Sequence, residues 1–269
     1  MLFTFLKWAF ILWVLFVIAL IIYLFYRKKQ FIQQEEIKIT KQQEMASSRN
    51  NAITVAKNDF EKAVLNIPQH KIELSKNRTK HLLIKDMPII TTKTLTKSSN
   101  KEKVCDYTVI DIETTGLKVS TAKILQVSAI RFENFEPVDC FTTYINPKKE
   151  IPEESIKING ITNENVCNAP EIEYVITSLK EYIGKSILVG HNIYFDLKFL
   201  YKYGLDVFST KNPIYDTVEL SKKAFKDLLN YKLETVCKYN GIYFNAHNSL
   251  NDCLATGKLF KAIVDEIIY

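Results

Sequence analysis

Two acidic side chains lie two residues apart in the middle of the chain. Asp111 and Glu113 belong to the sequence DIETTGL at 111–117, which continues the apolar, β-rich run VCDYTVID at 104–111. On a β-strand, residues i and i+2 point to the same face, so the two carboxylates are expected to lie side by side. Each raises the pKa of the other unless a divalent cation neutralises the pair. Oxygen ligands of this kind favour Mg²⁺ or Mn²⁺.

The residues after the acidic pair are more informative than the pair itself, because acidic residues are common at strand ends. Gly116 permits a tight turn and a close approach of the backbone to a ligand. Leu117 would then lie beside the carboxylates, exposed enough to contact a ligand.

A second acidic motif, GHNIYFD at 190–196, follows a short apolar run at 186–189. Its acid, Asp196, is expected at the start of the next helix. An isolated acid at that position is usually a favourable charge at the helix N-terminus, so Asp196 is informative only together with the other motifs.

A third motif, HNSLND at 247–252, is expected to open the last helix. Asp252 would lie early in the helix and His247 at or before its start, so that one could face a metal while the other reaches a water. A single histidine is usually structural. This chain has only four, however, and two of them, His191 and His247, lie inside acid-bearing motifs.

Together and in this order, the motifs resemble those of the DEDDh 3′–5′ exonucleases, a family with a ribonuclease-H-like fold that includes the epsilon proofreading subunit of bacterial DNA polymerase III. The resemblance covers about residues 104–265. Four further stretches are similar to the family, at 124–130, 158–162, 215–217 and 233–242. The related tyrosine-type subfamily needs a tyrosine four residues before the last acid, where this chain has Asn248, so the histidine type is favoured.

The resemblance implies two-metal hydrolysis that releases nucleoside 5′-monophosphates from the 3′ end of DNA. One of two Mg²⁺ or Mn²⁺ ions would lower the pKa of a bound water and the other would stabilise the leaving 3′-oxygen. His247 would act as the general base, for which an imidazole pKa of about 6.5 is suitable. The implied metal ligands are Asp111, Glu113, Asp196 and Asp252.

The resemblance also implies a set of residues that bind a single-stranded or frayed 3′ end. Leu117 would wedge against the terminal base, and backbone groups around Thr114 and Thr115 would hold the strand. His191 and Asn192 complete the expected substrate-binding set. Binding by stacking and shape would give little sequence preference.

Two other functions stay open on the residues alone. A ribonuclease of the same family, acting on RNA ends or short oligoribonucleotides, would differ only in contacts to the 2′-hydroxyl. A catalytically silent module that binds nucleic acid or tethers a partner at a membrane would not need all five active-site side chains. Proofreading would require a polymerase or another nucleic-acid enzyme as a partner.

The motifs lie in a region whose pattern alternates between strands and helices. Antiparallel strands are expected at 104–111, 124–132 and 139–145, with a hairpin turn at Asn134. The remaining elements are short strands at 186–189 and 213–215 and helices at 169–183, 195–203, 217–224, 232–239 and 249–267. The predicted fold is therefore α/β, a ribonuclease-H-like mixed sheet flanked by helices, preceded by a transmembrane helix and a basic linker.

The first 26 residues predict a transmembrane anchor. No residue from Trp8 to Tyr26 is charged, and nineteen helical residues span about 28 Å, close to the thickness of a bilayer core. The stretch is longer than the apolar part of a signal peptide and lacks a small-residue cleavage site. Because basic residues follow directly at 27–29, a single-pass protein of the cell membrane with its catalytic domain in the cytoplasm is expected.

Residues 27–103 are predicted to be a basic, partly helical linker. They contain 17 basic and 8 acidic residues, a net charge of +9, whereas the predicted exonuclease domain at 104–269 carries a net −4. Helices are expected at 30–46 and 51–66, and the polar run at 81–103 is expected to be a flexible boundary. Such a linker would bind anionic lipid or nucleic acid, or would simply be solvated.

The composition excludes several other classes of protein. Hydrophobic residues make up 47% and charged residues 25% of the 269 residues, which is typical of one or two globular domains. The five cysteines are odd in number and include no C-x-x-C pair, so neither a disulfide framework nor a zinc site is expected.

Overall fold

The computed structural model describes residues 2–268, without the side chains of residues 2–15, 17–22, 24, 31–34, 36 and 37. Packing divides the chain into two compact units, Met1–Val55 and Ala56–Tyr269. Helix α1, Leu2–Leu65, runs through the first unit and contributes its last turns to the second. It contains both helices that were expected between residues 30 and 66.

The predicted anchor at residues 1–26 falls largely on side chains that lie outside the described part. Within the part of the chain that the structure describes, no helix is both long enough and apolar enough to cross a bilayer.

A five-stranded mixed sheet forms the centre of the second unit, in the order β3-β2-β1-β4-β5. The three N-terminal strands pair antiparallel, and β4 and β5 run parallel to β1. The strands are β1 Tyr107–Thr114, β2 Ile124–Glu133, β3 Glu136–Tyr144, β4 Leu188–Gly190 and β5 Ile214–Asp216. The predicted mixed sheet is therefore confirmed, as is the turn after β2, where Asn134 and Phe135 adopt the left-handed conformation of a tight hairpin.

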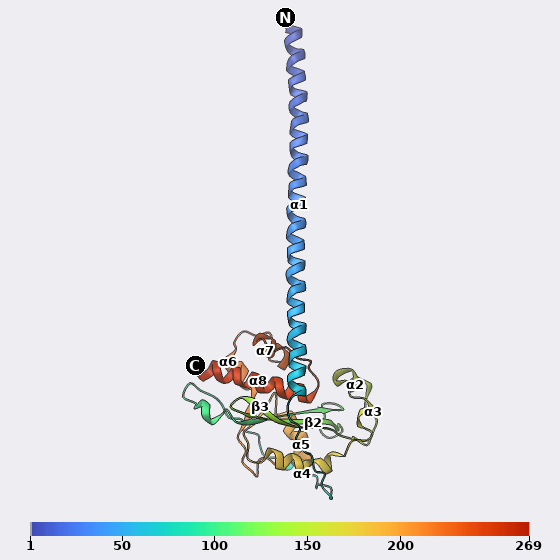
Figure 1. Ribbon diagram of the computed structural model, residues 1–269, viewed down its shortest axis with the longest axis vertical. Coiled ribbons are helices and arrows are strands. Elements are labelled where there is room, and N and C mark those ends of the chain that lie inside the picture. The colour runs from blue at the N-terminus through green and yellow to red at the C-terminus, as the bar shows by residue number, and fades with distance from the viewer. Residues whose placement is uncertain (1, 269) are drawn as a thin grey trace. The chain divides into compact units, whose positions relative to one another are not determined.

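Helices cover both faces of this sheet (Figure 1). Their bounds are α2 Glu153–Asn159, α3 Asn163–Val166, α4 Ile172–Ile183, α5 Tyr194–Lys202, α6 Thr217–Ala224, α7 Leu233–Tyr239 and α8 Ser249–Ile268. Side chains alternate along β1, so that Val109 packs in one buried cluster with α6, α7 and α8, while Ile110 packs in another with α4 and α5. The short helices α2 and α3 were not predicted, whereas the other five were.

Helix α8 packs unusually close to the sheet, because it carries a glycine at the contact. A Cβ on Gly257 would lie 2.1 Å from the ring of Phe132 on β2. The hydroxyl of Tyr107 on β1 donates a hydrogen bond to the Gly257 carbonyl at 2.9 Å. This contact fixes the helix whose first turn carries Asp252.

Residues 66–103, called the strap below, cross the surface of the second unit in mostly irregular backbone with two short 3₁₀ helices, η1 Ile84–Asp86 and η2 Lys101–Lys103. Backbone amides of the strap donate to the domain at several points, including Leu82 to Lys202 at 3.0 Å and Lys93 to Ile214 at 2.6 Å. Ile67 and Leu95 are buried in the core cluster of α8.

The expected flexible boundary at 81–103 is thus an attached part of the domain. The compact second unit begins at Ala56, whereas composition suggested that the exonuclease domain begins at residue 104. The physical reason is that a few apolar residues and many backbone hydrogen bonds attach the strap, while its average composition remains polar and basic.

Candidate active site

Three acidic side chains meet at the end of the central strand. Asp111 and Glu113 lie on β1, and Asp252 lies in the first turn of α8. One carboxylate oxygen of each lies within 4.8 Å of the other two. The pairing of β1 with β2 becomes irregular between Glu113 and Thr114, which separates the strand end from its neighbour. The side-by-side arrangement expected from the D-x-E spacing is therefore present, and α8 adds a third acid.

The fourth acid, Asp196, lies behind the strand end in the first turn of α5 and is only 4% exposed. Its Oδ1 accepts a hydrogen bond from the backbone amide of Ile112 at 3.1 Å. Because Ile112 lies between Asp111 and Glu113, Asp196 is anchored to the segment that carries the acidic pair.

The carboxyl groups titrate far from their ordinary range, because they are withdrawn from water and close to one another. Burial, followed by the charges of Asp196, Asp252 and Glu113, raises the pKa of Asp111 well above its usual value. Burial raises the pKa of Glu113 to about 7, and burial together with the charge of Glu113 raises the pKa of Asp252 to about 8. Such a cluster is stable at neutral pH when protons or a cation reduce its negative charge.

The hydrogen bonding of Asp252 also fits a cation. Its Oδ2 accepts from the His247 amide at 3.2 Å. Its Oδ1 is buried and has no hydrogen-bond partner among the described residues. A buried carboxylate oxygen without a donor is costly, and a divalent ion held jointly with Asp111 and Glu113 would satisfy it.

His247 lies at the edge of this cluster, exposed to solvent and in the left-handed conformation with φ of 66°. The next residue, Asn248, caps α8, since its Oδ1 accepts from the amides of Leu250 and Asn251, each at 3.2 Å. The hydroxyl of Ser249 lies 2.7 Å from that of Ser128 on β2. Asn248 and Ser249 thus fix the start of α8, although the sequence analysis did not single them out as functional. The preference of asparagine and serine for helix N-termini was the sequence signal that could have identified them.

The loop after β1 presents one apolar side chain to solvent. The Thr114 hydroxyl donates to the Gly116 carbonyl at 2.8 Å, and Thr115 exchanges two hydrogen bonds with Lys123, which close the loop. Gly116 has φ of 151°, a conformation that favours glycine. Leu117 is 85% exposed, as a residue that contacts a ligand would need to be.

His191 and Asn192 differ in what they can contact. The ring nitrogens of His191 lie 2.9 Å from the Thr217 hydroxyl and 2.8 Å from the Tyr231 carbonyl. Burial lowers the pKa of His191 to about 4. The ring is therefore neutral and occupied within the protein, where it supports the loop, whereas Asn192 is exposed.

Two polar residues at the site were noted in the sequence only as parts of family-like stretches. Asn159, at the end of α2, donates to the Thr114 carbonyl at 3.4 Å, and its hydrogen bond to Glu113 opposes the rise in that residue's pKa. Asp216 is buried and accepts from the Asn192 amide at 3.0 Å. Neither has a local spacing that would reveal its role, because each depends on a contact between distant segments.

Comparison with known proteins agrees with this geometry. Residues 108–260 match the family model RNase_T, described as Exonuclease, which covers more than half of the chain. The chain belongs to this exonuclease family. The enzyme class expected from the motifs, a 3′–5′ exonuclease hydrolase, is thereby confirmed.

Relatives of this exonuclease domain include proteins named as DNA polymerase III. The PolC-type DNA polymerase III of Clostridium perfringens is 38% identical over 158 residues, which is 58% of this chain and 11% of that protein. The DNA polymerase III subunit epsilon of Aquifex aeolicus is 34% identical over 164 residues, 60% of this chain and 81% of that protein. The chain thus spans only about a tenth of the length of the PolC-type relatives.

A solved structure shares the fold. E. coli exonuclease I in complex with a dT13 oligonucleotide aligns with a TM-score of 0.53 and 19% identity, over 60% of this chain and 41% of that one. At that identity the likeness concerns the mixed, ribonuclease-H-like sheet and its flanking helices.

Proposed function

We propose that this exonuclease is of the DEDDh type and removes nucleotides from the 3′ end of DNA with two divalent cations. The observation that supports the proposal most is the meeting of Asp111, Glu113 and Asp252, with one buried oxygen of Asp252 left without a donor among the described residues. A catalytically silent binding module would have no use for such a costly cluster.

In the proposed mechanism, Asp111, Glu113 and Asp252 would hold the cations, Mg²⁺ or Mn²⁺, and Asp196 would complete the site. The bound cations would supply charge neutralisation and Lewis acidity for attack of water on the terminal phosphodiester. His247 accepts the proton of that water, for which its exposed position is suitable. Asp196 holds the Ile112 amide and so keeps the acidic pair in position.

The substrate is proposed to be single-stranded or frayed DNA, with Leu117 against the terminal base and Thr114, Thr115 and Asn192 along the strand. The names of the relatives, DNA polymerase III of the PolC type and subunit epsilon, support DNA over RNA. They also support a polymerase as a partner of this chain.

The test uses the full chain and 5′-labelled single-stranded DNA and RNA of the same sequence. With Mg²⁺ or Mn²⁺ the DNA should shorten stepwise from its 3′-hydroxyl end, and EDTA should stop the reaction. Internal cuts, or full activity in EDTA, would contradict the proposal. Faster shortening of the RNA would instead favour the ribonuclease alternative.

A second proposal concerns location. The charge-free stretch from Trp8 to Tyr26 and the basic residues after it support a single-pass anchor in the cell membrane, with the nuclease domain in the cytoplasm. The protein should then stay with membranes through carbonate and salt washing, and protease added to intact cells should spare the domain. Release by salt alone would rule out the anchor and leave only electrostatic attraction of the basic residues 27–103 to lipid.

A further inference from the structure

A groove with a volume of about 590 Å³ runs beside the loop that follows β1. One wall is loop residues 117–120, which follow the acidic pair by a few residues. The second comprises Lys198 and Lys202 of α5, and the third is residues 81–84 of the strap. The strap wall lies outside residues 108–260, the part that matches the exonuclease family.

The three walls are attached to one another. The Leu82 amide donates to the Lys202 carbonyl at 3.0 Å, and the Lys202 ammonium donates to the Val119 carbonyl at 2.9 Å. The His81 ring lies 2.9 Å from a carboxylate oxygen of Glu173 on α4. The strap is therefore a fixed side of the groove.

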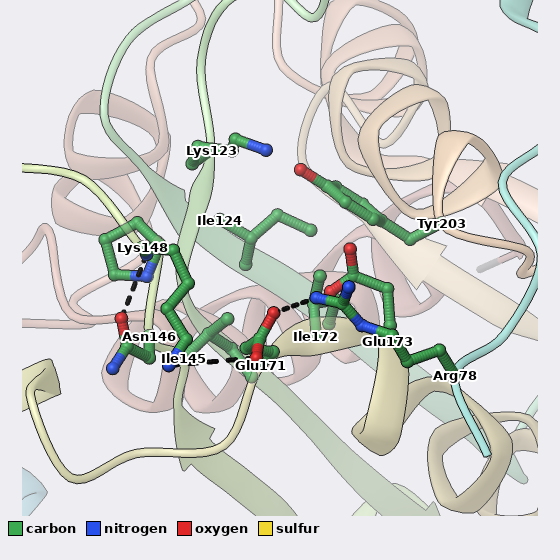
Figure 2. A pocket seen from close by; sticks show the side chains of 11 residues that line it. Arg78, Lys123, Ile124, Ile145, Asn146, Lys148, Glu171, Ile172, Glu173 and Tyr203 are labelled. Atoms are coloured by element: carbon green, nitrogen blue, oxygen red, sulfur yellow. Dashed lines mark hydrogen bonds and ion pairs between the residues drawn. The ribbon is translucent and has the colours of Figure 1, made fainter.

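The charge of the groove is of one sign. Lys118, Lys198 and Lys202 line it, and none of its described lining residues is acidic. A second hollow nearby differs in this respect (Figure 2), because its Arg78 and Lys148 both pair with Glu171, and Glu173 also lines it. The hollow thus contains acidic as well as basic side chains, whereas the charged side chains of the groove are all basic and complement phosphates.

Apolar side chains line the groove together with these cations. Leu117 on the loop wall is 85% exposed and Leu83 on the strap wall is 60% exposed, and Val119 and Ile84 also line the groove. Base faces are free to contact such side chains only in an unpaired strand, because a duplex stacks them inside.

We propose that the groove binds the single-stranded DNA that precedes the 3′-terminal nucleotide, and that the strap is thus a wall of the substrate channel. This inference rests on the proposed function, since it assumes that the strand end lies at the carboxylates. Lysines contact the phosphates, and the leucines on the two walls contact the bases. The strap adds a substrate contact that the matched family region does not contain.

The strap wall is tested by Leu83→Glu in the full chain, with Ile89→Glu as a matched control. Ile89 is also on the strap and 92% exposed, but it does not line the groove. Leu83→Glu should raise KM for an oligo-dT of about 12 nucleotides by about tenfold, because the new carboxylate repels the phosphodiester backbone of the DNA. It should leave hydrolysis of thymidine 5′-monophosphate p-nitrophenyl ester within about twofold of wild type, since that small substrate does not reach the groove.

Failure of the proposed function and failure of the groove inference can be told apart. If wild type hydrolyses neither substrate, the proposed function is wrong. If wild type is active and Leu83→Glu keeps the wild-type KM for the oligonucleotide, the groove inference alone is overturned. Equal rises of KM in Leu83→Glu and Ile89→Glu would also overturn it, because they would reflect charge on the strap in general.

The cationic walls are tested by the salt dependence of oligo-dT binding. Lys118→Gln with Lys198→Gln should reduce the slope of log K against log salt by about 0.7 for each phosphate contact removed. Lys238→Gln is the control, an exposed lysine on α7, across the sheet from α5 (Figure 1). An unchanged slope in the double variant would place the strand elsewhere.

Discussion

His247 and Asp252 come from one short segment, yet their surroundings suit them to different tasks. Asp252 is buried in the first turn of α8 and has one oxygen without a donor among the described residues. His247 precedes the helix, is exposed, and has a left-handed backbone. The first setting suits a cation and the second suits proton exchange with water.

Replacing His247 should therefore slow turnover and spare metal binding. Asparagine is the best substitute, because it tolerates the φ of 66° that strains alanine. For His247→Asn we expect single-turnover rates that are about 10²- to 10⁴-fold lower than those of wild type. Its affinity for Mn²⁺, measured by calorimetry, should stay close to that of wild type. A wild-type rate at neutral pH would show that His247 is structural.

Asp111→Asn is the comparison variant, because it removes a cluster ligand from the strand. It should lose both activity and Mn²⁺ binding, and so differ from His247→Asn in the calorimeter. If both variants bind Mn²⁺ equally, the assignment of ligand and base is wrong.

Removing one acid should stabilise the metal-free protein while abolishing activity. The folded-state pKa values of Asp252 and Glu113, about 8 and about 7, exceed their ordinary values. The protonated carboxyl groups therefore contribute to the stability of the folded protein at low pH. This contribution is lost as the groups ionise while the pH rises through about 4 to 8. In EDTA at pH 8, Asp252→Asn should raise Tm by several degrees, a gain on the order of a few kcal/mol.

The control for this prediction is the same comparison at pH 4, where Asp252 and Glu113 are protonated in the folded protein and the two Tm values should converge. Mn²⁺ should raise the Tm of wild type at pH 8 and should raise that of the variant less. A lower Tm for Asp252→Asn in EDTA would mean that the carboxylate contributes more through its hydrogen bond to the His247 amide than it costs by repulsion.

At the scale of elements, the seating of α8 on the sheet depends on Gly257. Gly257→Ala would place a methyl group against the Phe132 ring, and overpacking of this kind costs about 1–3 kcal/mol. Thermal unfolding should show the loss, and activity should fall as well, because α8 carries Asp252. Adding Phe132→Leu should restore part of the stability; a double variant that shows only the summed losses would refute the contact.

The elements that carry the acids were largely predictable, for local reasons. A period of two on β1 places Asp111 beside Glu113, and the apolar pattern of 249–267 predicts the helix that brings Asp252 to them. Residues such as Asn159 and Asp216 were not predictable as site residues, because their contacts join segments far apart in the sequence. Residues 81–103 of the strap were expected to be a flexible boundary, because their polar composition conceals Leu95, which is buried.

At the scale of the whole molecule, packing predicts which fragments fold. A fragment of residues 56–269 retains Phe60, Val64 and Leu95, all buried in the core cluster of α8. It should unfold cooperatively at a Tm close to that of the longer chain. A fragment of residues 104–269 lacks these side chains and one wall of the groove, so it should have a Tm lower by several degrees or more.

Limited proteolysis checks the same prediction independently. Trypsin should cut the full chain between the two compact units before it cuts the basic strap, although the strap offers many lysines. Early cleavage within residues 66–103 would show that the strap leaves the surface readily, and the groove would then lack a stable wall.

The way in which the strap is attached has a consequence for evolution. Several of its links use backbone amides, such as those of Ser75, Thr79, Leu82 and Lys93, which donate to carbonyls of the domain. A backbone amide is the same in every residue except proline, so substitutions can accumulate along such a segment while its path persists. Related exonucleases can therefore have a strap attached in this way without any detectable sequence similarity in that segment. Only their three-dimensional structures would then reveal the shared feature.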